Sequence, residues 1–453
     1  MARNTWYRLD NVGKFYSSQA GSSFQTVFRY SATLIDVIDA STLQQALNKA
    51  VDLFPSFNVC LRSGMFWHYL EQSHDTPEVS RENLPICYGL HVDTKSVLFR
   101  VSYYQNRINF EVSHIVSDGR GSLNFFKALL YTYIQRQYGV EDVQIEYDGS
   151  DRQKSENSFD KYFERDKITT ENNGAKTDVP KPKIYRLSGF KDVADATFIE
   201  YHLPTGKTRD LARSYGVSLT SLIIAAIMKS ISMEMARRER NRAIRIDIPV
   251  DLRRIFESET TKNFFGLAYV SYVPKENETV HHIALKIQEQ FKTATQEDQL
   301  KPRMNRMIAL EKNPFIRYAP LFVKDIGLEI GDWWTARETT TTVSNLGPIT
   351  INSKLASYLK DINILTSASG MKFTFCSFGE DLSIGISTVF TNLDIIKNFC
   401  RFFSSKEIYG HININKTSEE VAAHLREAKI EVSVKRLGDQ ISRNTNASKK
   451  DIS

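Results

Sequence analysis

A strand, a sharp turn and a helix meet in the stretch Phe110-Glu111-Val112-Ser113-His114-Ile115-Val116-Ser117-Asp118-Gly119. Two apolar alternating runs, 98–104 and 108–112, are separated by Gln105-Asn106-Arg107, which predicts a β-hairpin. Beyond Gly121 the apolar residues recur at helical spacing, at Phe126, Leu130, Tyr133 and Ile134. The pattern places His114 at a strand end and Asp118-Gly119 at the exit into a helix. Histidine accepts and returns protons readily near neutral pH, although a histidine satisfied beside an Asp-Gly turn would give the same pattern.

Composition and charge narrow the class of protein. The 453 residues are enough for two or three domains, and 41% hydrophobic with 25% charged residues is typical of a soluble globular protein. The net charge of +6, from 59 basic and 53 acidic residues, is mild and spread along the chain. It does not indicate nucleic-acid binding, and it suits a solvated surface or an anionic small ligand.

Several common features are missing from the sequence. The first residues lack the apolar segment of a signal peptide, and no run reaches the roughly 18 apolar residues of a membrane span. The four cysteines are widely scattered, so we expect reduced core residues in a cytoplasmic protein. The nine histidines show no ligand-like spacing, and we expect no metal site and no bound cofactor.

Periodicity predicts the elements on either side of a polar segment. Before it, residues 24–34 form a strand, and the capping box Ser41-Thr42-Leu43-Gln44 opens a helix that ends at Pro55. After it, we predict strands at 197–203, 244–249 and 339–343, a buried helix at 218–235, a hairpin at 371–378 and 382–390, and a helix at 393–403. The predicted domains are 1–145 and 191–437, with a polar linker at 146–190 and a disordered tail at 438–453.

Three motifs occur in a fixed order. The first is His114-x-x-x-Asp118-Gly119; the second is Pro249-Val250-Asp251-Leu252-Arg253 with Asn263-x-x-Gly266; the third is Ser344-Asn345-Leu346-Gly347-Pro348. Together they resemble the chloramphenicol acetyltransferase-like acyltransferases, a superfamily that includes peptide-synthetase condensation domains and alcohol acetyltransferases. The resemblance covers about residues 24–403. Ser113 replaces the first histidine of the doubled histidine that is usual in condensation domains, and the Asp-Phe-Gly-Trp-Gly motif of plant acyltransferases is absent. Both departures favour a stand-alone alcohol-acetyltransferase-like enzyme.

The resemblance implies an α/β fold of two domains, each a mixed sheet with flanking helices, and an active-site tunnel between them. It also implies acyl transfer from acyl-CoA, a co-substrate, to a small-molecule acceptor, with O-acylation favoured over N-acylation. His114 would be the general base, and its alanine variant is expected to fold normally because we expect few packing contacts there. Asp118 would shape the site with Gly119 by pairing with Arg253, or else Arg254. The alternative for Asp118 is a simple helix cap.

Other assignments stay open. Ser344 and Asn345 are candidate oxyanion or substrate-binding residues, and a capped turn around Gly347-Pro348 explains them equally well. The donor could instead be a thioester on an acyl carrier protein, as in condensation domains. A third hypothesis is a catalytically silent scaffold or binding protein of the same fold.

Overall fold

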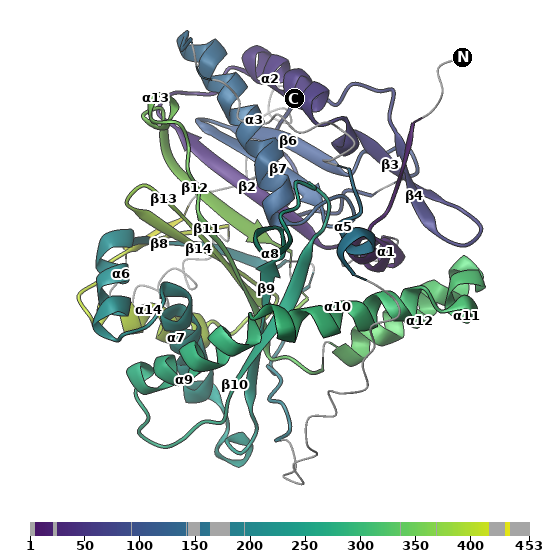
Figure 1. Ribbon diagram of the computed structural model, residues 1–453. Helices are drawn as coiled ribbons and strands as arrows, with labels where there is room; N and C mark the ends of the chain where they lie inside the picture. The colour runs from purple at the N-terminus through teal and green to yellow at the C-terminus, as the bar shows by residue number, and fades with distance from the viewer. Residues whose placement is uncertain are drawn as a thin grey trace, which may run out of the picture.

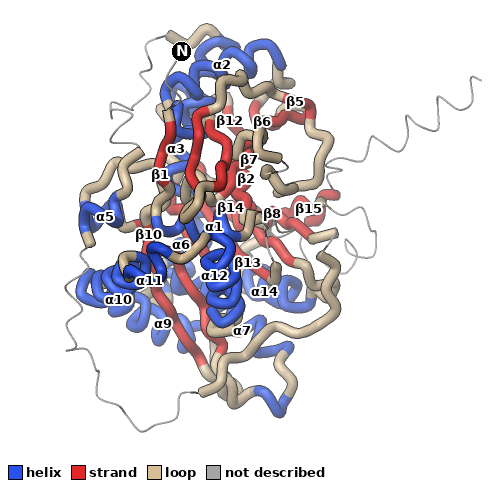
Figure 2. Tube along the Cα trace, turned by 90° about the vertical axis from the view of Figure 1, so that its right-hand side faces the viewer, coloured by secondary structure: helices blue, strands red, loops and turns tan. Residues whose placement is uncertain are grey.

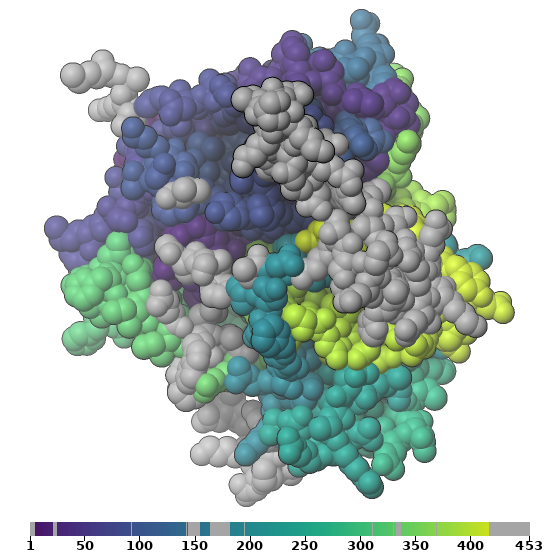
Figure 3. Space-filling view, turned by 180° about the vertical axis from the view of Figure 1, so that it is seen from behind, coloured from purple at the N-terminus to yellow at the C-terminus, as the bar shows by residue number. Residues whose placement is uncertain are grey.

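The computed structural model describes residues 5–20, 25–91, 93–141, 143, 155–163, 182–193, 195–335, 337–367, 369–415 and 431–434. It consists of two α/β halves, one above the other, each with a sheet and flanking helices (Figure 1). From behind, the purple and blue surface of the first half lies above the teal and yellow surface of the second (Figure 3). The predicted fold class is confirmed.

The first half is built on a five-stranded sheet. Its strand order is β12 (Leu359–Thr366), β2 (Val27–Leu34), β7 (Arg107–Ser113), β6 (Phe99–Tyr104) and β5 (Ser80–Arg81). The predicted hairpin is present as β6 and β7, which pair antiparallel. Helices α2 (Ala40–Leu53) and α3 (Gly119–Tyr138) pack on this half, and Phe110 stacks on Phe125 of α3 with ring centroids 4.9 Å apart. A small sheet is formed by β1 (Trp6–Arg8), β4 (His68–Gln72) and β3 (Val59–Ser63). Helix α1 (Asn11–Ser18) follows β1 in sequence, and the 3₁₀ turn η1 (Pro55–Phe57) precedes β3.

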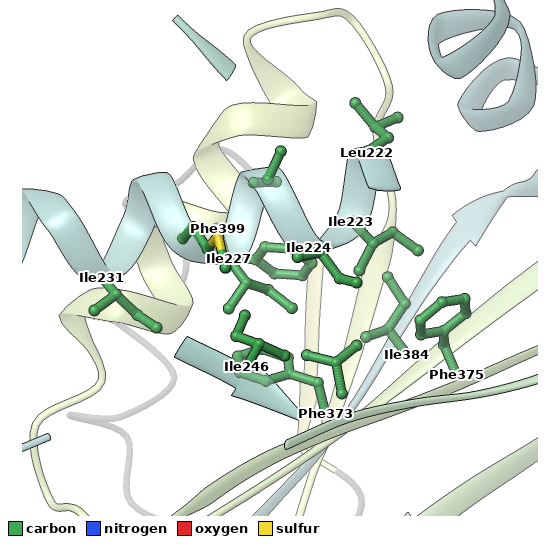
Figure 4. Packing of buried hydrophobic residues seen from close by; sticks show 14 of the residues in the cluster. Leu222, Ile223, Ile224, Ile227, Ile231, Ile246, Phe373, Phe375, Ile384 and Phe399 are labelled. Atoms are coloured by element: carbon green, nitrogen blue, oxygen red, sulfur yellow. The ribbon is translucent and has the colours of Figure 1, made fainter. Parts of the chain in front are cut away.

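The second half is built on an eight-stranded sheet. Its order is β10 (Phe265–Tyr272), β9 (Ile244–Asp251), β11 (Thr341–Pro348), β13 (Met371–Phe378), β14 (Asp381–Thr388), β8 (Thr197–Pro204), β15 (His411–Ile414) and β16 (Glu431–Val434). Helix α7 (Leu219–Glu234) is apolar nearly all round because it packs against this sheet and also against the helices α9 (Val280–Ala294) and α14 (Asp394–Ser404). Figure 4 shows Ile224 and Ile227 of α7 above Ile246 and Phe373 of the sheet.

One strand of the second half belongs to the sheet of the first. After α13 (Ser353–Ala356), β12 pairs antiparallel with β2 over seven residue pairs, and the chain then returns to the eight-stranded sheet as β13. The sheets approach closely there, because a Cβ on Gly385 of β14 would lie 2.0 Å from the Ile364 carbonyl oxygen. Residues 359–366 fall within the range predicted for the second domain. The predicted linker, 146–190, and tail, 438–453, lie largely or wholly outside the described residues.

Three local predictions are wrong. Helix α2 is capped by Asp39, whose carboxylate accepts from Thr42 N at 2.7 Å, rather than by Ser41. Strand β9 continues through Pro249 to Asp251, since Pro249 pairs opposite Leu267 of β10 while the pairing of β9 with β11 is limited to Ile246 and Asp247. The segment predicted as a turn, 344–348, is the end of strand β11, with a bulge between Asn345 and Gly347.

Three consecutive helices border the junction between the halves. Helices α10 (Glu297–Glu311), α11 (Pro314–Tyr318) and α12 (Leu321–Thr335) follow one another, and α12 packs beside α1 (Figures 1 and 2). Lys14 of α1 forms an ion pair with Glu311 of α10, and Lys324 Nζ donates to the Phe66 carbonyl at 2.7 Å. The other helices are α5 (Ser158–Tyr162), α6 (Thr205–Ser214), α8 (Arg253–Phe256) and the 3₁₀ turn η3 (Arg237–Glu239).

All four cysteines, Cys60, Cys87, Cys376 and Cys400, are buried and free. Within the described ranges no single helix has the length and apolar composition for crossing a membrane, although the bent pair α6 and α7 reaches them together. In the same ranges no three His, Cys, Asp or Glu side chains are grouped as a metal site would need.

A candidate active site between the two halves

A large open cavity lies between the two halves and contains the residues of all three motifs. Its volume is about 2520 Å³, and its walls are mainly apolar. The first half contributes His114, Asp118 and Gly119, and the second contributes Arg253, Ser344 and Asn345. These residues are up to 231 positions apart in the sequence, so only the assembly of both halves brings them together.

His114 follows β7 directly and is held on both backbone and ring. Its N–H donates to the Thr26 carbonyl at 2.9 Å. Its ring stacks on Tyr16 with centroids 4.1 Å apart, and it also contacts the rings of Phe28 at 4.5 Å and Phe265 at 5.6 Å. Only 7% of the residue is exposed. The expectation that this position makes few packing contacts is therefore wrong, since three aromatic rings enclose the imidazole.

One amide fixes the tautomer of His114. Its Nδ1 lies 2.7 Å from Asn263 Oδ1. The Asn263 amide nitrogen donates to the Asp10 carboxylate at 3.0 Å and to the His114 carbonyl at 3.1 Å, and both of these groups can only accept. The amide oxygen must therefore face the imidazole, and Nδ1 must carry the proton. Nε2 is then left as the basic nitrogen of a ring that lines the cavity.

The surroundings of His114 keep the imidazole neutral. Burial lowers the pKa of His114 to about 4, because the charged form would lose its hydration. The direct partner is a neutral amide, and the nearby Asp118 charge offsets the burial only in part. A histidine with this pKa is unprotonated at pH 7 and can accept a proton at Nε2.

Asp118 serves both of the roles that the sequence left open. Its Oδ1 accepts from the N–H groups of Arg120 at 3.1 Å and Gly121 at 2.8 Å, which caps α3. The same carboxylate pairs with the Arg253 guanidinium at 2.9 and 3.1 Å, and its Oδ2 accepts from Phe264 N at 2.7 Å. The pair with Arg253 is present as expected, while Arg254 is exposed. One buried carboxylate thus joins the helix start to the second half.

All three guanidinium nitrogens of Arg253 donate hydrogen bonds within the protein. Its Nε donates to the Thr260 carbonyl at 2.7 Å, and its guanidinium also donates to the Lys262 carbonyl and to Asp251 at 3.0 Å. The loop 260–264 is therefore wrapped around one guanidinium, which positions Asn263 against His114. Arg253 acts on the site by placing this loop.

The turn after His114 requires a glycine at one position. A Cβ on Gly121 would lie 1.9 Å from the Thr261 carbonyl oxygen, so a side chain is excluded where the helix meets the loop. Gly119 has an ordinary negative φ, and a Cβ there would meet Tyr30 and Leu346 at 3.5 and 3.6 Å, which are normal contact distances. Gly119 instead accepts a hydrogen bond from the Tyr30 hydroxyl through its carbonyl.

The two candidate oxyanion donors, Ser344 and Asn345, differ in whether their side chains already have hydrogen-bond partners. Asn345 donates to Thr220 Oγ1 at 2.8 Å and accepts from Gly347 N at 2.7 Å, so its amide holds the bulge in β11. Ser344 is half-buried in the cavity wall, and its hydroxyl has no hydrogen-bond partner in the described ranges. A donor role remains a prediction for both residues, and the geometry favours Ser344.

Sequence reasoning missed Asn263 as a partner of His114 and Asp10 as a partner of Asn263. Asp10 is 1% exposed, caps α1 through Gly13 N at 2.6 Å, and accepts from Asn263. Burial raises the pKa of this carboxyl. Asn263 stood within a quoted motif, which was the available signal for it. Asp10 lies 253 positions from Asn263, and no local pattern identified it.

Comparison with known proteins rests on structure. The chain matches no protein-family model and no curated protein sequence. Its fold is similar to polyketide synthase associated protein 5 from Mycobacterium tuberculosis, with TM-score 0.57 and 14% identity over 87% of this chain and 97% of that one. It is also similar to the first condensation domain of the calcium-dependent antibiotic synthetase in complex with a substrate analogue, with TM-score 0.58 and 13% identity over 88% and 95%.

A third similar structure is the mutated starter condensation domain of rhizomide synthetase in complex with C8-CoA and Leu-SNAC. The TM-score is 0.56, and the identity is 11% over 88% of this chain and 93% of that one. At these identities the likeness shows the fold alone. The chain therefore has the condensation-domain fold of two chloramphenicol acetyltransferase-like halves.

Proposed function

We propose that this chain is an acyltransferase that moves an acyl group from a thioester to an alcohol or amine, with His114 as general base. The observation that supports this most strongly is the hydrogen bond from His114 Nδ1 to Asn263 Oδ1, which leaves Nε2 basic in a cavity shared by both halves. Proteins of the same fold include condensation domains, one of them a mutant in complex with C8-CoA and Leu-SNAC.

The proposed reaction needs one proton carrier. Nε2 takes the proton of the acceptor hydroxyl or amine as its oxygen or nitrogen attacks the thioester carbonyl. The carbonyl oxygen becomes an oxyanion, for which the Ser344 hydroxyl is the candidate donor. The C–S bond then breaks, and the imidazolium returns its proton to the departing thiolate. The electron pair of the C–S bond leaves with the sulfur, and the acceptor's proton ends on the thiol. The products are an ester or amide and a free thiol.

Thiol release distinguishes the three candidate functions. The chain is incubated with acetyl-CoA or longer acyl-CoA and a panel of alcohols and amines, and free thiol is measured. Release with CoA thioesters supports the CoA-dependent enzyme, with O-acylation the favoured outcome. Release only with an acyl-loaded carrier protein supports a condensation-type enzyme, and no release with either supports the silent scaffold.

We predict an unusually low acid limit for this reaction. Because the pKa of His114 is lowered to about 4, the base stays neutral well below pH 6.5, where an ordinary histidine becomes charged. kcat/KM should therefore stay nearly constant from pH 7 down to pH 5.5. The same shift lowers stability as the pH falls from 6.5 toward 4, since the unfolded chain binds this proton first. Circular dichroism at each pH separates unfolding from loss of the base, and an activity loss centred near pH 6.5 in folded protein would contradict the prediction.

We also predict that donor binding weakens with salt if the donor is CoA. Several cations on the cavity wall are engaged in structure, among them Lys14 with Glu311 and Lys324 with two carbonyls. Arg186 and Lys191 are exposed residues of the cavity lining, where Lys191 Nζ donates to the Ser369 carbonyl at 3.3 Å, and they are our candidates for binding the phosphates. Replacing both with alanine should weaken CoA binding by roughly tenfold at low ionic strength. Arg213→Ala, a change of an exposed arginine on α6, is the matched control. CoA binding that changes neither with salt nor in the double variant would refute the idea.

A further inference from the structure

The floor of the cavity carries a row of polar side chains across four neighbouring strands. Tyr269 of β10 pairs opposite Asp247 of β9, Asp247 opposite Thr342 of β11, and Thr342 opposite Lys372 of β13. All four side chains line the cavity. Because strand side chains alternate between faces, the neighbouring residues Ile246, Val343 and Phe373 are turned into the core instead. The row is therefore a feature of the cavity face alone.

Asp247 differs from the other carboxylates of the cavity. Asp118 and Asp251 are paired with Arg253, Glu311 is paired with Lys14, and Asp195 is exposed. Asp247 is only 9% exposed, yet it forms no ion pair within the described part of the chain. Its hydrogen-bond partner there is the Thr342 hydroxyl, at 3.0 and 3.1 Å from the two oxygens.

The negative charge of Asp247 is only partly balanced by the positive charges near it. Burial raises the pKa of Asp247 to about 6, against the opposing effect of Thr342 and the positive fields of Lys372 and Arg245. Arg245 lies with its guanidinium carbon 4.5 Å from the Tyr269 ring centre. A buried carboxylate without a direct cation is stabilised by a cation that the ligand supplies, through a charge-assisted hydrogen bond.

The strand geometry sets the distance between this row and His114. Asp251 and Phe265 form the pair of β9 and β10 that is next to His114, and the Phe265 ring contacts the imidazole. Asp247 and Tyr269 are four residues further along the same strands, which is about 13 Å at the rise of a β-strand. A group bound by Asp247 is therefore remote from the reacting atoms.

We propose that Asp247, with Thr342, binds a protonated amine at the distal end of the acceptor, so that the acceptor class is an amine-bearing molecule with its nucleophile about 10 Å or more from that amine. The inference rests on the proposed acyl transfer for the identity of the molecule as an acceptor. Asp247 is a specificity residue in this proposal, since it touches the substrate away from the bond that forms.

Equilibrium binding tests the proposal without any turnover. Isothermal titration calorimetry on the full chain compares linear amino alcohols of increasing length with the terminal diols of the same length, with no donor present. We expect the native chain to prefer an amino alcohol of matching length by about tenfold or more, the usual strength of a charged hydrogen bond. Asp247→Asn should abolish this preference. Asp195→Asn, a charge-matched change on the same cavity, should retain it.

Two results would overturn the proposal. One is equal binding of amino alcohol and diol by the native chain, a result that depends on no variant. The other is a preference that survives in Asp247→Asn with a native melting curve, which would mean that Lys372 and Arg245 already balance the carboxylate. The thiol-release assay is independent of both, so an amine preference without thiol release would retain this site and reject acyl transfer.

Discussion

Replacing His114 with alanine should lower turnover by about a hundredfold or more, the usual contribution of a general base. The physical reason is that Nε2 is the basic nitrogen of the only histidine in the described ranges that is locked by Asn263 and lines the cavity. Initial rates of thiol release at saturating donor and acceptor measure the effect. Because the base acts in the chemical step, kcat should fall more than KM rises.

The same variant should also be less stable, because the ring packs against Tyr16, Phe28 and Phe265. Activity is therefore compared only where circular dichroism shows folded protein. His91→Ala is the matched control, since His91 is a half-buried histidine on the same cavity wall and lacks the Asn263 contact. Near-native turnover in folded His114→Ala, or an equal loss in His91→Ala, would reject His114 as the base.

Separating Asp118 from Arg253 should destabilise the protein by about 3–5 kcal/mol for either alanine variant, because Arg253→Ala leaves the buried Asp118 carboxylate without its cation and Asp118→Ala leaves the buried Arg253 guanidinium with Asp251 alone. Asp118→Ala should be the worse of the two, since it also removes the cap of α3, worth about 1 kcal/mol. Denaturant titration measures the free energy of unfolding for each variant. Both should lose activity as well, because the loop that carries Asn263 depends on Arg253.

The double variant decides between coupling and independence. With both side chains gone, neither Asp118 nor Arg253 is left as a buried charge without the other, so the combined loss should be smaller than the sum of the single losses. Arg254→Ala is the matched control, because this neighbouring arginine is exposed and should change stability little. Additive losses in the cycle would mean that the pair contributes no coupling, and that Asp118 acts mainly as a helix cap.

The sequence alone determined the local parts of this site. The alternation in 98–112 and the helical spacing after Gly121 predicted β7, the turn and α3, because a hairpin and an amphipathic helix each depend on neighbours a few residues apart. The resemblance of three ordered motifs supplied the two-part fold and the pair of Asp118 with Arg253.

Tertiary structure decided what depends on contacts between distant segments. Pro249 stays within β9 because the pairing of β9 with β11 is limited to Ile246 and Asp247, so Pro249 has a strand neighbour on its β10 side alone. Residues 344–348 extend β11 because β13 pairs with them. The exchange of β12 between sheets has no local signature, since its alternation suits either sheet.

The protonation of His114 was likewise decided by the tertiary structure. Its low pKa comes from burial among the rings of α1, β2 and β10, which outweighs the opposing effect of the Asn263 amide that Asp10 orients, and these groups come from three separate segments. The sequence determined which side chain can carry the proton and where it stands on its strand. The assembled halves determined which nitrogen is basic and that it is neutral, because desolvation and hydrogen-bond direction are properties of the packed cavity.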